Sequence, residues 1–207
     1  PDSKVTVEAT FKASAPTGKN PFIDVPAGSY YEDAVIWAVG KGITTGMSAA
    51  AFDPNGSCTR AQIVTFLWRA AGCPEVKGDC PFTDVAENSP YCTAITWAAQ
   101  EGIAQGFDAD HFRPGDPVSR AQFVTFLWRY ENKPIVSTLA KFDDVSESSV
   151  YYNAIMWAVE NKITAGTTAT TFSPNAICTR GQIVTFLFRA SGAEKVEADV
   201  NFTDVAA

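Results

Sequence analysis

The sequence has few of the residues on which catalytic and metal sites depend. It contains a single histidine, His111, and five cysteines, no two of which form a Cys-x-x-Cys pair. One histidine disfavours a His-dependent catalytic triad as a shared function, and the cysteine spacing gives no sign of a zinc site. No separate pair of carboxylates stands out as a hydrolase centre. We therefore expect no enzyme, no cofactor and no metal.

The chain also lacks a basic excess and a long hydrophobic run. Sixteen Lys and Arg residues against 23 Asp and Glu give a net charge of −7, which disfavours a nucleic-acid partner held by bulk electrostatics. Apolar runs such as residues 63–68 fall far short of the ~20 residues of a membrane span, so we expect no membrane partner. The chain begins at Pro1 without a methionine or a signal sequence, and we expect a piece excised from a longer protein.

What the sequence does have is a repeat of 60 residues that occurs three times without an insertion. The segment TRAQIVTFLWR, which starts at Thr59, differs at two of eleven positions from SRAQFVTFLWR and at two others from TRGQIVTFLFR. A fixed period of this kind indicates repeated structural units that pack on one another. The recurring residues include Phe22, Phe82, Phe142 and Phe202; Asp24, Asp84, Asp144 and Asp204; Trp37, Trp97 and Trp157; Gly46, Gly106 and Gly166; and Arg60, Arg120 and Arg180.

Each repeat has the pattern of two helices joined by a turn-rich connector. In the first repeat the stripe of Ala34, Trp37 and Ala38 predicts an amphipathic helix over residues 30–39. The second helix begins at Thr59 and is apolar nearly all round, which is typical of a helix surrounded by protein. We therefore expect an all-α fold of three helix-loop-helix repeats, whose second helices form a central three-helix bundle with pseudo-threefold closure.

The period also divides the chain. Residues 5–11 alternate like a strand, so the segment before the repeats is either the end of a preceding β domain or a leader. The Phe-x-Asp-Val motif that opens each repeat occurs four times, but the helix that carries the repeated arginine occurs only three times. A closed arrangement can therefore seat three of the four motifs equivalently, and we predict that Phe22 or Phe202 is less buried than the other copies. The expected segments are 1–20, the repeats 21–80, 81–140 and 141–200, and the start of a further opening at 201–207.

The repeated arginine stands at an unusual place in its helix. Thr59, Ser119 and Thr179 are each followed three residues later by Gln, which fits a capping box and puts the arginine at the first helical position. A cation there opposes the helix dipole at a cost of about 0.3–1 kcal/mol. One interpretation is a receptor in which the guanidinium and free backbone N–H groups bind a carboxylate or phosphate. The other is a structural salt bridge to a Phe-x-Asp-Val aspartate.

Two other repeated residue types also leave alternatives open. The tryptophans lie at helical spacing, so they are either core side chains or, beside an arginine, a wall on which a sugar stacks. The repeated glycines serve either a turn with positive φ or the close approach of a ligand.

The five cysteines cannot all pair within one chain. Cys73 and Cys80 flank a short loop that a disulfide could close. Cys58 and Cys178 occupy equivalent positions in two repeats, where we expect them to pack as small hydrophobic side chains.

The frame Phe-x-Asp-Val, Tyr-x-x-Ala-x-x-Trp-Ala, Gly-Ile-x-x-Gly, Phe-x-Pro and Thr-Arg-Ala-Gln resembles the S-layer homology domain, as three tandem motifs over residues 22–191. The resemblance implies a three-pronged pseudo-trimeric spindle that anchors a larger surface protein non-covalently to the bacterial cell wall, outside the cell. It implies as partner a secondary cell-wall polysaccharide, typically with pyruvate ketals, bound in grooves between motifs. A pyruvate ketal presents a carboxylate on a sugar, which suits an arginine beside an aromatic ring.

The resemblance also assigns residues. The basic residue of the family's Thr-Arg-Ala-Glu signature maps onto the repeated arginine, while Gln replaces the Glu in all three copies. We favour a capping role for that side chain, which Gln keeps, and expect the third copy to bind most weakly because Gly181 replaces Ala. The competing hypothesis is a module that assembles with other surface-layer proteins and has structural arginines. The ligand-binding set is Arg60, Arg120, Arg180, Thr59, Ser119, Thr179, Trp37, Trp97, Trp157, Gly46, Gly106, Gly166, Asp24, Asp84 and Asp144, with no catalytic residue or metal ligand.

Overall fold

The computed structural model describes residues 18–137 and 140–193. The predicted strand over residues 5–11 and the Phe202 opening lie outside this range. Among the helices of the described residues, none has the length and hydrophobicity that crossing a membrane requires. The helices are α1 (Glu32–Gly40), α2 (Arg60–Ala70), α3 (Cys92–Gln100), α4 (Arg120–Tyr130), α5 (Tyr152–Glu160) and α6 (Arg180–Ala190).

The helices α2, α4 and α6 each begin at a complete capping box. Thr59 Oγ1 accepts a hydrogen bond from the Gln62 N–H at 3.3 Å, and Gln62 Oε1 accepts one from the Thr59 N–H at 3.0 Å. The same reciprocal pair recurs at Ser119 and Thr179. Gln therefore completes the cap without a negative charge, as predicted.

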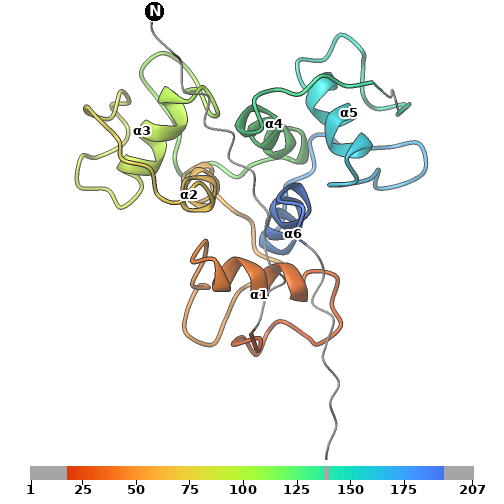
Figure 1. Cartoon of the computed structure of the whole chain (residues 1–207). Coiled ribbons are helices and arrows are strands. Elements are labelled where there is room, and N and C mark those ends of the chain that lie inside the picture. The colour runs from red at the N-terminus through yellow and green to blue at the C-terminus, as the bar shows by residue number, and fades with distance from the viewer. Residues whose placement is uncertain (1–17, 138–139, 194–207) are drawn as a thin grey trace, which may run out of the picture.

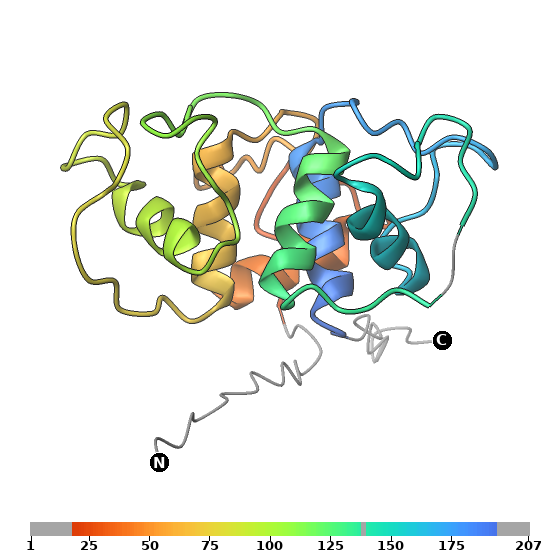
Figure 2. The same cartoon turned by 90° about the horizontal axis from the view of Figure 1, so that it is seen from above.

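Each lobe of the molecule combines helices from two different repeats. Helix α3 packs on α2, α5 packs on α4, and α1 packs on α6. The first helix of a repeat thus covers the second helix of the repeat before it, and the first repeat closes onto the third. Figure 1 shows the three lobes around a centre formed by α2, α4 and α6, and these three helices stand side by side in Figure 2. The expected all-α arrangement with pseudo-threefold closure is confirmed.

Backbone contacts between the segments that precede the central helices close the ring. The Val118 N–H donates to the Cys58 carbonyl at 3.3 Å, and the Cys178 N–H donates to the Val118 carbonyl at 3.0 Å. Ser57 and Thr179 form an antiparallel bridge that joins the first repeat to the third. Because each repeat pairs with both others, the arrangement is closed and has no free end repeat.

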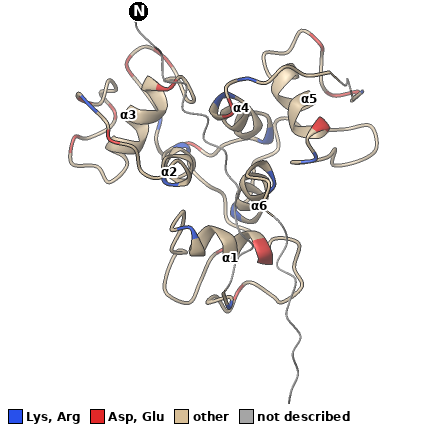
Figure 3. Ribbon diagram, in the orientation of Figure 1, with Lys and Arg blue, Asp and Glu red and all other residues tan. Residues whose placement is uncertain are grey.

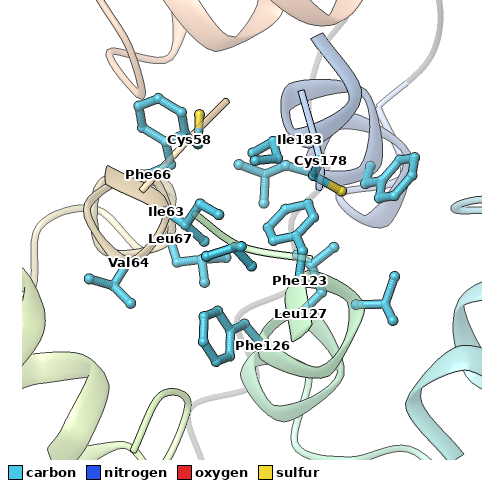
Figure 4. Packing of buried hydrophobic residues seen from close by; sticks show 14 of the residues in the cluster. Cys58, Ile63, Val64, Phe66, Leu67, Phe123, Phe126, Leu127, Cys178 and Ile183 are labelled. Atoms are coloured by element: carbon cyan, nitrogen blue, oxygen red, sulfur yellow. The ribbon is translucent and has the colours of Figure 1, made fainter. Parts of the chain in front are cut away.

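The centre of the bundle is a hydrophobic core. Ile63, Phe123 and Ile183 occupy equivalent positions on the central helices and are at most 1 % exposed. Figure 4 shows them between the three helices together with a leucine one turn further along two of them. Phe123 stacks on Phe186 with 6.0 Å between the ring centroids. Burial of each such side chain contributes about 1.5–3 kcal/mol, so these helices depend on their neighbours for stability.

Burial of the opening phenylalanines tests the Phe22 half of the prediction, because Phe202 lies outside the described residues. Phe22 and Phe82 are 5 % and 7 % exposed, whereas Phe142 is only partly buried. Phe22 is therefore not the less buried copy. Its ring packs against Phe52, with the ring centroids 5.6 Å apart, so the first opening is seated as fully as the second.

The cysteines fall into buried and accessible groups. Cys58 and Cys178 are fully buried, as expected, and burial raises the pKa of their thiols to about 11 and about 12. The described cysteines are all free thiols, so a Cys73–Cys80 disulfide is absent. Cys80 instead lies near Cys92 at the start of α3, and burial together with this neighbouring thiol raises the pKa of Cys92.

Candidate functional site

Each repeated arginine is buried and reaches from its own helix into the following repeat. Arg60, Arg120 and Arg180 are 8 %, 5 % and 3 % exposed. Burial lowers the pKa of the first two below its ordinary value, although an arginine in a protein stays protonated. Each Nε donates to a main-chain carbonyl of the next repeat at 2.8–3.0 Å; the acceptors are Phe112, Phe172 and Phe52. The arginines therefore tie neighbouring repeats together.

The N-termini of the arginine-bearing helices α2, α4 and α6 have no N–H group left for an anion. At α6 the Arg180 and Gly181 N–H groups donate to the carbonyls of Gly56 and Pro54 at 2.8 and 2.9 Å. The next N–H donates to the hydroxyl of Thr179, and equivalent bonds begin α2 and α4. The hypothesis of an anion receptor built from free helix N–H groups is wrong, because loop carbonyls of the adjacent repeat occupy these donors.

The aspartates of the Phe-x-Asp-Val motif fasten the loop that holds the acceptor phenylalanine. The Asp24 carboxylate accepts from the N–H groups of Phe52 and Asp53 at 2.8 and 2.7 Å. Asp84 and Asp144 make the same two bonds in their repeats. Burial opposes ionisation of Asp24, but the two N–H donors outweigh it and hold the pKa below its ordinary value.

The predicted salt bridge between arginine and aspartate does not form. Among the described residues, the ion pairs involve His111 and Arg113 but none of the repeated arginines. Instead the two charges flank one residue: Asp24 binds the N–H of Phe52, and Arg180 binds its carbonyl. The interpretation was wrong about the contact, and the aspartate supports the arginine site through the backbone.

One groove brings a repeated arginine and a repeated glycine together. It has a volume of about 260 Å³ and is lined by loop 44–47 and helix α2 of the first repeat, Tyr91 of the second and Arg180 of the third. Arg69 on α2 adds a second guanidinium, whose Nη1 donates to the Ile43 carbonyl at 3.1 Å. Figure 3 shows basic residues on each of the central helices. Two cations in one groove suit an anionic ligand.

Arg180 differs from its two counterparts in its remaining hydrogen bonds. The Nη2 atoms of Arg60 and Arg120 donate to the carbonyl of the residue just before the repeated glycine, at 2.8 and 3.0 Å. Arg180 makes no such bond, and within the described residues its Nη2 has no acceptor. Its Nη1 has only the sulfur of Cys58, at 3.8 Å. The groove that Arg180 lines thus contains an uncommitted guanidinium nitrogen.

The repeated glycines are required for two different reasons. Gly46 has a φ of 83°, whereas Gly106 and Gly166 lie outside the left-handed region. At all three positions a Cβ would collide with the opening phenylalanine and with a loop carbonyl. The predicted positive-φ turn is therefore confirmed at Gly46 and wrong at the other two, where lack of space alone requires glycine.

The repeated tryptophans belong to the core. Trp37, Trp97 and Trp157 are 1 %, 6 % and 5 % exposed. Trp37 packs edge-on against Phe188, with 5.6 Å between the ring centroids. Burial this deep fits core side chains and not a sugar-stacking wall, and Trp157 alone of the three also lines the larger groove described below. The aromatic residues that line the groove of Arg180 are Phe66 and Tyr91.

Sequence reasoning missed several residues of this groove. Thr44, Gln62, Arg69 and Tyr91 line it beside the predicted Gly46 and Arg180. Arg69 and Tyr91 recur at the same period as the predicted residues, so repetition alone would have found them. Their convergence with Arg180 requires closure of the ring, for which the sequence has no local signal.

A larger groove, of about 590 Å³, lies near the C-terminal ends of α4 and α6 and is lined by Glu131, Trp157, Glu160 and Arg189 among others. It contains two carboxyl groups, and burial raises the pKa of Glu131. Since it has none of the predicted arginines, it suits an anion less well. Within residues 18–137 and 140–193, no three His, Cys, Asp or Glu side chains group as a metal site would require.

Comparison with known proteins agrees with this repeat structure. Residues 21–64, 81–124 and 141–184 match the S-layer homology domain. An S-layer protein of Bacillus thuringiensis subsp. finitimus is 27% identical over 176 residues, which are 84% of this chain and 21% of that protein. Exoglucanase XynX of Acetivibrio thermocellus is 25% identical over 167 residues, 77% of this chain and 15% of that protein.

A third relative is the surface-layer 125 kDa protein of Lysinibacillus sphaericus, 29% identical over 157 residues, 73% of this chain and 13% of that protein. The chain therefore spans about a fifth or less of the length of these relatives. The family match itself covers more than half of the chain. The chain belongs to the S-layer homology domain family, the non-catalytic modules that anchor surface proteins at the bacterial cell wall.

Proposed function

We propose that this module binds a secondary cell-wall polysaccharide through a carboxylate, typically that of a pyruvate ketal, in the groove lined by Arg180. The observation that carries the proposal is the Nη2 atom of Arg180, which has no acceptor within the described residues. A guanidinium held in place by one strong main-chain bond and open on another edge is a preorganised donor for a carboxylate.

The rest of the groove fits a sugar that carries this acid. Arg69 lies along the same wall, and Tyr91 offers an aromatic ring with a polar tip. The chain has a net charge of −7, so an anionic polymer must be held by local cations. The proposal makes Arg180 the strongest of the three arginine sites. The sequence had suggested the opposite, because Gly181 replaces Ala next to Arg180.

The other predicted residues support this groove indirectly. Thr179 caps the helix that carries Arg180, and Asp24 holds the Phe52 peptide to which Arg180 is tied. They are positioning residues. Their counterparts in the other two repeats do the same for Arg60 and Arg120. Several weak sites on one repeating polymer would together give high avidity.

The competing function is assembly with other surface-layer proteins. One observation favours it: Arg60 and Arg120 use both Nε and Nη2 on main-chain carbonyls of the neighbouring repeat. For these two arginines a structural role accounts for the contacts. If all three arginines were bound in this way, the module would present no free guanidinium nitrogen to an acidic glycan.

Co-sedimentation with cell walls separates these functions. The walls are intact, stripped of secondary polymer, or stripped only of pyruvate, and the proteins are the wild type, Arg180→Met and Arg189→Met. Arg189 is an exposed arginine on the same helix, so its variant matches the loss of charge. We expect the wild type and Arg189→Met to pellet only with intact walls and Arg180→Met to stay in solution. Equal pelleting of the wild type with all three wall preparations would contradict glycan binding.

A further inference from the structure

The connector of the second repeat presents an aromatic ring to solvent. Phe107 is 60 % exposed, although phenylalanine is among the residues most often buried. Met47 occupies the equivalent position in the first repeat and lines the groove of Arg180. Gln105, two residues before Phe107, contributes the carbonyl that accepts from Nη2 of Arg60. Phe107 therefore lies close to Arg60, in the place that Met47 takes beside Arg180.

Contacts within the connector hold this ring in one position. The Phe107 N–H donates to the His111 carbonyl at 2.7 Å, and His111 Nδ1 lies 2.9 Å from Asp108 Oδ1. The Arg113 guanidinium covers one face of the ring, with its Cζ 3.3 Å from the ring centroid. The N–H of Arg113 donates in turn to the Asp84 carboxylate at 2.7 Å. A ring that is fixed in this way loses little conformational freedom when a ligand packs on it.

The surroundings of the ring suit a sugar. Because the guanidinium covers one face, the exposed area lies on the opposite face and the outer edge. Four polar side chains near the ring are each about half exposed: Asp108, His111, Arg113 and Asp116. A pyranose has a face of C–H groups, which packs on an aromatic face, and an edge of hydroxyl groups, which bonds to carboxylate and guanidinium groups.

The charge of this connector favours an uncharged sugar over an acidic one. Residues 107–116 contain three aspartates and one arginine, whereas residues 47–56 contain one aspartate and residues 167–176 contain no charged residue. Arg60 has both Nε and Nη2 bound to main-chain carbonyls. A carboxylate at Phe107 would therefore meet an excess of negative charge without the free guanidinium nitrogen that Arg180 offers.

We propose that Phe107 is a stacking platform for an uncharged sugar residue of the wall polymer. The inference rests on the proposed function and adds a second class of sugar to it, because the Arg180 groove binds the acidic residue. One aromatic side chain buries about 150–250 Å², which suits the face of one sugar ring. A stable protein interface buries about 800 Å² on each partner, and along residues 48–134 Phe107 is the one large hydrophobic side chain that is exposed.

Amide NMR tests the platform with two uncharged probes, methyl glucoside and methyl N-acetylglucosaminide. We expect the amide signals of residues 108–113 to shift with a probe, and methyl glucoside that carries a pyruvate ketal to need a higher concentration than its parent. Phe107→Tyr keeps the ring and the midpoint, whereas Phe107→Leu keeps an apolar side chain without a ring face and raises the midpoint about fivefold. Ile23→Ala removes another exposed hydrophobic side chain and is the control with an unchanged midpoint.

Co-sedimentation with intact walls measures the same loss on the polymer. Phe107→Leu should need about five times the wall concentration of Ile23→Ala for half of the protein to pellet. All these side chains lie at the surface, so the variants should unfold at the urea midpoint of the wild type. A dependence on Phe107 that persists on walls stripped of secondary polymer would identify a protein partner and overturn the sugar assignment.

The remaining outcomes separate the platform from the proposed function. Unmoved amide signals of residues 108–113 with both uncharged probes would overturn the platform, as would equal midpoints for Phe107→Leu and Phe107→Tyr. The proposed function would stand in both cases, provided that the wild type pelleted only with intact walls. If the wild type pelleted equally with all three wall preparations while the uncharged probes still shifted these signals, the proposed function would fail and Phe107 would remain a sugar site.

Discussion

Replacement of Arg120 by methionine should destabilise the whole module, because it breaks a tie between two repeats. Arg120 is 5 % exposed, and its guanidinium donates to the carbonyls of Phe172 and Ala165, both at 3.0 Å. Methionine keeps much of the apolar stem but provides no donor. Each carbonyl left without its partner costs about 1–3 kcal/mol. The free energy of unfolding should therefore fall by about 4 kcal/mol, within a range of about 2–6 kcal/mol.

The corresponding change at Arg180 should cost less. Its guanidinium makes one main-chain bond, to the Phe52 carbonyl, so Arg180→Met should lower the free energy of unfolding by about 1–3 kcal/mol. Arg189→Met is the control, because its bond to the Ile163 carbonyl comes from an exposed side chain and its loss should cost under about 1 kcal/mol.

Urea unfolding followed by circular dichroism and tryptophan fluorescence measures these losses. The midpoint should shift with an unchanged slope, since the surface exposed on unfolding stays the same. Should Arg120→Met unfold at the same urea concentration as Arg189→Met, the buried arginines would not be structural ties and the reasoning would be refuted.

Three further predictions concern the backbone and the acidic residues. Lys162 has a φ of 57° where Gly42 and Gly102 stand in the other repeats; Lys162→Gly should raise the free energy of unfolding by about 0.5–1 kcal/mol, seen as a higher Tm. Gly166→Ala sets a Cβ against loop carbonyls and should lower the free energy of unfolding by about 1–3 kcal/mol in the urea assay. Burial opposes ionisation of Asp144, but its N–H donors outweigh it and lower its pKa, so this carboxylate stabilises the fold fully above its unfolded pKa of about 3.9. That contribution disappears as the pH falls through the lower folded pKa, and Asp144→Asn should flatten this part of the acid-unfolding curve.

Each of these expectations has a contrary result. A lower Tm for Lys162→Gly would show that its left-handed backbone is not strained. Wild-type stability of Gly166→Ala would show that the loop has room for a side chain. If the acid-unfolding curves of Asp144→Asn and the wild type superimpose, the Asp144 carboxylate does not contribute to the stability of the fold.

Much of the fold was predictable because its determinants are local. The spacing of Ala34 and Trp37 indicates the amphipathic first helix, and the pairing of Thr59 with Gln62 places the start of the second within one residue. The exchange of helices between repeats was not predictable. Whether α1 packs on its own repeat or on α6 depends on the path of the connector over residues 41–59 and on ring closure, neither of which leaves a pattern in hydrophobic periodicity.

The candidate site was predictable only as a set of repeated positions. The period identifies Arg180 and Gly46, but their roles depend on main-chain partners such as the Phe52 carbonyl, and a carbonyl has no signature in the sequence. The free helix N–H groups and the arginine–aspartate salt bridge were wrong for the same reason: backbone groups of the neighbouring repeat occupy both the N–H donors and the guanidinium. The difference between Gly46 and Gly106 is a matter of φ, which identical residues do not reveal.

The central claim is that the Arg180 groove binds the carboxylate of a wall glycan. It is tested most directly by a crystal structure of the module with a pyruvylated fragment of the wall polymer. We predict the carboxylate within hydrogen-bond distance of Arg180 Nη2, with Gly46 still at positive φ and the Phe52 carbonyl still bound to Nε. A fragment bound elsewhere, with Nη2 of Arg180 left without a ligand oxygen, would contradict the account.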